Sequence, residues 1–93
     1  MKNIKLIAES ATMFKALGNA KRLEIIYVLR GKERKVGELE KMLHISQSAL
    51  SQHLAVLRAA DIVSTRREAQ FVYYSLTNAR CKHLLDFLDS IYS

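Results

Sequence analysis

The sequence has 93 residues, with 15 Lys or Arg against 9 Asp or Glu, so its formal net charge is +6. This length suits one domain spanning residues 1–93, and the 49% of hydrophobic residues argues against disorder. The positive charge favours a protein that binds nucleic acid or an anionic membrane surface over one that is merely soluble and basic. The single cysteine excludes an internal disulfide framework, and because no stretch has the length of a membrane span or the pattern of a signal peptide, we expect a cytoplasmic protein.

Helical periodicity predicts two helices in the first third of the chain, at about 3–16 and about 20–30. Gly18 and Gly31 are expected to end them, and Asn19 is expected to cap the start of the second. The first helix has two apolar sides. Because a terminal helix of a small domain covers only one side with its own core, the second side predicts contact with a partner chain.

The middle of the chain predicts two short helices separated by a tight connection. The charged link 32–35 is expected to be a loop, and a helix at about 36–43 follows it. After the connection at 44–45, Ser46 is expected to cap a helix that runs to about Ala60.

This last helix, which begins after Ser46, has an unusual exposed face. Leu50, Leu54 and Leu57 form its buried stripe. The opposite face carries small or neutral side chains where Lys and Glu are usual: Ser48, Ser51, Gln52 and Ala55. Small side chains let a helix approach the base edges in a major groove, and Gln47 and Gln52 can both donate and accept hydrogen bonds there. A solvated face without a role is the alternative.

The final third of the chain predicts a β-hairpin and a helix. Residues 62–67 and 71–76 alternate with period two, although the link between them lacks the Gly or Asn of a strong turn. Thr77 or Asn78 is expected to cap a helix that extends to about residue 92. Its apolar seam predicts pairing with a second copy, together with Ile4, Ile7 and Ala11 of the first helix. The seam comprises Cys81, Leu84, Leu85, Leu88, Ile91 and Tyr92.

Two short helices followed by a hairpin predict a mainly α winged helix-turn-helix fold, with the helix-turn-helix at about 36–60 and the wing at about 62–76. Three stretches of the sequence resemble the ArsR/SmtB family of bacterial winged-helix repressors, and within it the HlyU, BigR, YgaV and NolR branch: 36-VGEL-39, 46-SQSALSQHLAVLR-58 and 62-IVSTRREAQFVYYSL-76. Weaker similarity covers 14–26 and the final helix. The resemblance implies a homodimer formed through the helices at about 3–16 and 78–92, and binding to pseudo-palindromic operators.

The resemblance also implies contacts with bases and phosphates from the fourth helix and from the wing: Gln47, Ser48, Ser51, Gln52, His53, Arg66, Arg67 and Gln70. Cationic side chains on an extended ribbon can reach phosphates or a neighbouring minor groove. His53 lies at the edge of the apolar face, so a structural histidine is its alternative role. Arg22 matches an arginine of the family, and it either touches phosphate or pairs with an acid.

Sensor positions of the family are altered in this sequence. The places of metal ligands in metal-sensing members are occupied by Gly37, Glu38 and Leu39 on the third helix and by Asn78, Arg80 and Ile91 on the last. Tyr27 and Ser93 stand where the sulfur-sensing branch has its two cysteines, and Cys81 is expected to be a buried structural thiol. We therefore expect no metal, no cofactor and no dithiol sensor. Lys35 replaces the usual Ser or Thr, so Glu38 is expected to lack its capping partner.

The sequence thus predicts a dimeric, sequence-specific DNA-binding transcriptional regulator, a repressor by resemblance. Its partners would be operator DNA and a second copy of the chain, with no membrane and no small-molecule substrate. An alternative from another class is a protein-interaction module or antitoxin that keeps the fold without binding DNA. An enzyme is not expected, because no nucleophile is paired with a base and no Gly-rich phosphate loop is present.

Overall fold

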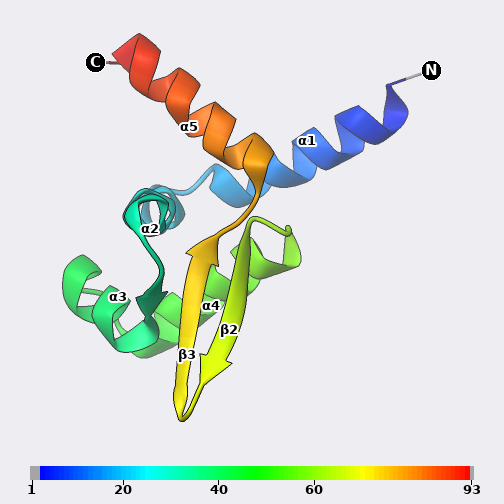
Figure 1. Ribbon diagram of the computed structural model, residues 1–93. Helices are drawn as coiled ribbons and strands as arrows, with labels where there is room; N and C mark the ends of the chain where they lie inside the picture. Colours follow the sequence, from blue (N-terminus) through cyan, green and yellow to red (C-terminus); the bar gives the residue numbers. More distant parts are fainter. Residues whose placement is uncertain (1–2, 93) are drawn as a thin grey trace.

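The computed structural model describes residues 3–92, which fold as a helical body with a small antiparallel sheet whose β-hairpin projects from it (Figure 1). The elements in chain order are α1 (Ile4–Leu17), α2 (Ala20–Gly31), β1 (Arg34–Lys35), α3 (Val36–Leu43), α4 (Gln47–Ala59), β2 (Val63–Glu68), β3 (Phe71–Leu76) and α5 (Ala79–Tyr92). All of the predicted helices and both predicted strands are present. The order is that of a winged helix-turn-helix, with α3 and α4 as the helical pair and β2 and β3 as the wing.

The sheet contains one strand that the sequence did not predict. Its strand order is β1-β3-β2, and β1 pairs with β3 through Arg34 opposite Tyr74 and Lys35 opposite Tyr73. The prediction that 32–35 is entirely loop was therefore wrong. A two-residue strand is too short for an alternating pattern, and it forms because β3 offers a free edge on the side away from β2.

The predicted hydrogen-bonding caps are confirmed. Asn19, Ser46 and Asn78 each accept a hydrogen bond from the backbone N–H three residues on, at 3.1, 3.3 and 2.9 Å, so Asn78 rather than Thr77 begins α5. The expectation for Glu38 was wrong. Its carboxylate accepts the backbone N–H of Lys35 at 2.9 Å, because that half of a capping box needs no side-chain acceptor on the cap residue.

The glycines end the first two helices as predicted, although not in the left-handed conformation that is common at helix ends. Gly18 has φ −78°, and Gly31 is still helical, so neither is left-handed. A Cβ at position 18 would lie 3.1 Å from the carbonyl oxygen of Phe14, so this glycine permits a close backbone approach. Left-handed residues among those described are His44 (φ 51°), Asp61 (φ 57°) and Ala69 (φ 55°), which stand at the turns around α4 and at the wing tip.

The core lies between α2, α3, α4 and the base of the wing, while the two terminal helices enter it with one end each. Ala16 and Leu17 at the end of α1 and Cys81 and Leu85 near the start of α5 are buried with it. The remaining lengths of α1 and α5 diverge from the body (Figure 1). Cys81 and Leu85 are 0% exposed within the single chain, so their predicted place in a dimer interface is corrected to the core.

Candidate nucleic-acid interface

The fold presents one polar face of α4 to solvent. His44 turns the chain between α3 and α4, and its backbone N–H donates to the carbonyl of Glu40. Leu50, Leu54 and Leu57 then anchor α4 in the core. The opposite face is exposed along the helix, and it carries the predicted base-contacting residues Gln47, Ser48, Ser51 and Gln52. A rigid helix thus holds neutral donors and acceptors on short side chains, as major-groove reading requires.

A shallow hollow of about 400 Å³ separates α4 from the wing. Ser51, Ala55 and Arg58 line it from the helix, and Tyr74 lines it from β3. Arg58 was not singled out in the sequence, although it ends the quoted 46–58 stretch. It is exposed and makes no ion pair within residues 3–92, so its charge is available to a phosphate.

Arg22 and His53 lie together behind this surface. The guanidinium of Arg22 donates through Nε to the carbonyl of Ala16 at 2.5 Å and through Nη2 to that of Lys15 at 3.4 Å, and its Nη1 lies 3.4 Å from Nδ1 of half-buried His53. These contacts join the end of α1 to α2 and α4. The geometry favours the structural alternative for His53. Arg22 is also held within the fold, but by backbone carbonyls and not by the acidic partner that was expected.

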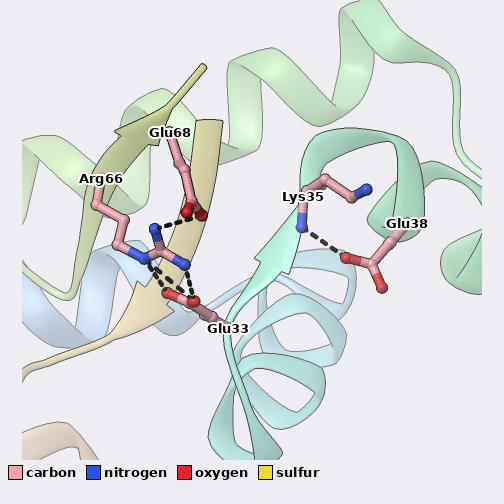
Figure 2. A network of polar contacts seen from close by, with 5 residues as sticks. All are labelled: Glu33, Lys35, Glu38, Arg66 and Glu68. Carbon is pink, nitrogen blue, oxygen red and sulfur yellow. Dashed lines mark hydrogen bonds and ion pairs between the residues drawn. The ribbon is translucent and has the colours of Figure 1, made fainter. Parts of the chain in front are cut away.

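The wing divides its two arginines between opposite faces of β2. Arg67 stands opposite Val72 and, like Gln70 at the tip, is exposed. Arg66 instead donates to Glu33 and Glu68 (Figure 2). Its guanidinium also lies 4.3 Å from the centre of the Tyr73 ring. These carboxylates raise the pKa of Arg66 further, and the hydrogen bond from Arg66 lowers the pKa of Glu33. Arg67 is thus accessible, whereas the guanidinium of Arg66 is held in ion pairs with Glu33 and Glu68.

The altered sensor positions take part in the fold. Arg80 donates to Glu9 of α1 at 2.6 Å, and the hydroxyl of Tyr27 donates to Asp89 at 3.5 Å, whereas Ser93 lies outside the described residues. Within residues 3–92 no three His, Cys, Asp or Glu side chains gather closely enough to hold a metal ion. Burial raises the pKa of the Cys81 thiol, which suppresses its reactive thiolate.

None of the helices within residues 3–92 is long and apolar enough to cross a membrane.

The diverging parts of α1 and α5 carry large apolar side chains in contact with solvent. The exposed ones are Ile4, Leu6, Ile7, Phe14, Phe87, Ile91 and Tyr92, while Leu84 and Leu88 are half-buried and Ala11 is exposed. Phe87 was missing from the predicted seam because it lies just outside the edge of the seam on a helical wheel, and 59% of it is exposed. A single chain therefore leaves most of the predicted dimer surface uncovered.

A helix-turn-helix whose second helix exposes a polar face, followed by a β-hairpin wing, defines a winged-helix protein of the DNA-binding class. The family model described as "Bacterial regulatory protein, arsR family" matches residues 19–65. The chain is 45% identical over 85 residues to the transcriptional activator HlyU of Vibrio cholerae, covering 91% of this chain and 79% of that protein. It is 42% identical to the biofilm growth-associated repressor of Agrobacterium fabrum, covering 95% and 75%. The chain belongs to the ArsR family, and it is a transcriptional regulator rather than an enzyme.

Solved structures agree with this assignment. HlyU from Vibrio cholerae superimposes with a TM-score of 0.89 at 44% identity, over 96% of this chain and 97% of that one. The winged helix-turn-helix DNA-binding domain of Mb0332 from Mycobacterium bovis, described as homodimeric, gives a TM-score of 0.88 at 26% identity, over 97% and 83% of the two chains.

Proposed function

We propose that this protein is a homodimeric, sequence-specific repressor that inserts α4 into the major groove of a pseudo-palindromic operator. The observation that carries the proposal is the face of α4, where Gln47, Ser48, Ser51 and Gln52 are all exposed on a helix anchored by three buried leucines. Carboxamides can form bidentate contacts with adenine, and serine hydroxyls can serve bases or phosphates. Arg67, Gln70 and Arg58 flank this face as sequence-independent or minor-groove contacts.

The homodimer is supported by the uncovered apolar surface of α1 and α5 and by the homodimeric description of the Mb0332 domain. Two copies related by a two-fold axis would present two α4 helices, and we expect half-sites about 10 bp apart. We also propose a cytoplasmic location, because the family comprises bacterial regulators and the proposed partner is operator DNA. Repression is proposed because the Agrobacterium relative is a repressor, although HlyU is an activator.

Regulation without a bound metal or a dithiol is part of the proposal. Two positions that hold metal ligands in metal-sensing members have other roles here, because Asn78 caps α5 and Arg80 pairs with Glu9. The single thiol, that of Cys81, is buried. No cofactor and no small-molecule substrate are assigned. An inducing signal, where one exists, would act by a different chemistry from that of the metal and sulfur sensors of the family.

The experiment is selection of binding sites from random double-stranded DNA with the full-length protein. We expect a pseudo-palindrome with two half-sites one helical turn apart. Ser51→Leu should abolish enrichment because a long side chain prevents close approach of α4, whereas the matched Ser51→Ala keeps the small size and should retain the motif. Normal enrichment with Ser51→Leu contradicts the proposed orientation. Failure of the wild type to enrich any sequence favours the protein-interaction alternative.

A further inference from the structure

Arg66 of the wing is held by the carboxylates of Glu33 and Glu68 (Figure 2). Its Nε lies 2.9 and 3.1 Å from the two carboxylate oxygens of Glu33, and its Nη2 lies 2.5 Å from one of them. Its Nη1 donates to Glu68 at 3.1 Å, and the guanidinium packs over the Tyr73 ring. A guanidinium that donates to two carboxylates and stacks on an aromatic ring is held in one position. The ammonium group of a lysine could not make the same set of contacts.

The contact spans the full width of the sheet. Because the strand order is β1-β3-β2, the side chain of Arg66 leaves β2, crosses β3 over Tyr73 and reaches Glu33, the residue that precedes β1. The segment 33–35 then continues directly into α3, whose first turn is capped by the Lys35 N–H and Glu38 pair (Figure 2). Glu33 therefore links the wing to the first residues of the helix-turn-helix.

The electrostatics oppose a direct role of Arg66 on DNA. Its one positive charge stands between the two carboxylates of Glu33 and Glu68, so that charge is already compensated where a phosphate would have to approach. A phosphate would also have to displace a bidentate partner. Arg67 differs on both counts, because it lies on the other face of β2 and makes no ion pair within residues 3–92.

We infer that Arg66 is a positioning residue whose contact with Glu33 fixes the wing relative to α4, so that Arg67 meets the DNA backbone. This inference rests on the proposed DNA binding. It divides the adjacent arginines into one that orients the wing and one that supplies its charge. The contact should therefore affect discrimination between operator and random DNA, whereas Arg67 should affect the salt dependence of binding to both.

The test is a double-mutant cycle on the full-length protein, with Arg66→Met, Glu33→Gln and the pair combined, and with the neighbouring Arg67→Met as matched control. Fluorescence anisotropy with the selected operator and with scrambled DNA, over a series of salt concentrations, gives affinity and salt slope. We expect each single variant to lose about three- to tenfold in operator discrimination, and the combined variant to lose no more than either, because both act through one contact. Arg67→Met should instead make the salt slope shallower by about one per subunit.

A phosphate contact by Arg66 predicts the reverse pattern. Arg66→Met would then reduce the salt slope as Arg67→Met does, and Glu33→Gln would tighten binding to both DNAs by removing a negative charge. Either result overturns the inference.

Amide hydrogen exchange in the free protein separates this inference from the proposed function. Protection of the β2 and β3 amides should fall in Arg66→Met and in Glu33→Gln but not in Arg67→Met. A wild type without operator preference would overturn the proposed function, and unchanged protection of the wing in both variants would overturn the Glu33–Arg66 link whether or not DNA is bound.

Discussion

Phe87→Ala should dissociate the proposed dimer while leaving the chain folded. Full burial of a phenylalanine side chain contributes about 1.5–3 kcal/mol, and 59% of Phe87 is exposed in the single chain, so about 1–2 kcal/mol per subunit remains for a partner to supply. A two-fold axis doubles the loss to about 2–4 kcal/mol for the dimer. The dimer dissociation constant should then rise by about thirty- to several-hundred-fold. The share of the ring that is already buried predicts a smaller loss of about 1 kcal/mol in unfolding free energy.

Sedimentation equilibrium over a dilution series measures this constant, and urea unfolding measures the stability of the fold. Leu85→Ala is the matched control, because it removes a side chain of the same helix that is 0% exposed in the single chain. It should lower the unfolding free energy by about 2–5 kcal/mol through a cavity. An unchanged dissociation constant in Phe87→Ala would refute the reasoning, since the ring would then not be at the interface.

Three further outcomes follow from local geometry. Ala69 has φ 55° at the wing tip, so Ala69→Gly should raise Tm by about 2–8 °C in a thermal melt, and a lower Tm would contradict the strain assigned there. The hydrogen bond from Arg66 lowers the pKa of Glu33, so the carboxylate stabilises the fold above its unfolded pKa and loses this contribution as the pH falls through its folded value. Urea unfolding at about pH 7 and about pH 3 should therefore show a larger loss of stability in Glu33→Gln, relative to wild type, at the higher pH than at the lower one. Because Cys81 is buried and its pKa is raised, operator affinity should be equal in reductant and disulfide oxidant, and a tenfold loss that Cys81→Ser abolishes would contradict this.

Sequence patterns were sufficient where structure is local. The leucine stripe of α4 and the caps Asn19, Ser46 and Asn78 predicted the helices because periodicity and capping act within one or two turns. The hairpin was predicted from the period-two alternation of its strands, although its turn signal is weak. The turn is formed with Ala69 at positive φ, where Gly or Asn is usual.

Contacts between distant segments were not predicted from the sequence. β1 forms because β3 offers a free edge. Glu33, which precedes β1, meets Arg66 of β2 because both β1 and β2 pair with β3. Two adjacent arginines looked equivalent in the sequence, and only their pairing showed that they differ. Cys81 and Leu85 were placed on the partner-facing seam because a helical wheel shows one apolar face without showing which part of it the chain's own core covers.

The central claim, that α4 reads DNA sequence, is tested most directly by Gln52→Ala. Titration of labelled operator and of scrambled DNA of the same length measures discrimination. The account predicts a loss of about 1–3 kcal/mol per half-site on the operator, about five- to 150-fold, with little change on scrambled DNA and an unaltered fold. Equal losses on both DNAs would contradict it and would reduce Gln52 to a contact with the backbone of the duplex.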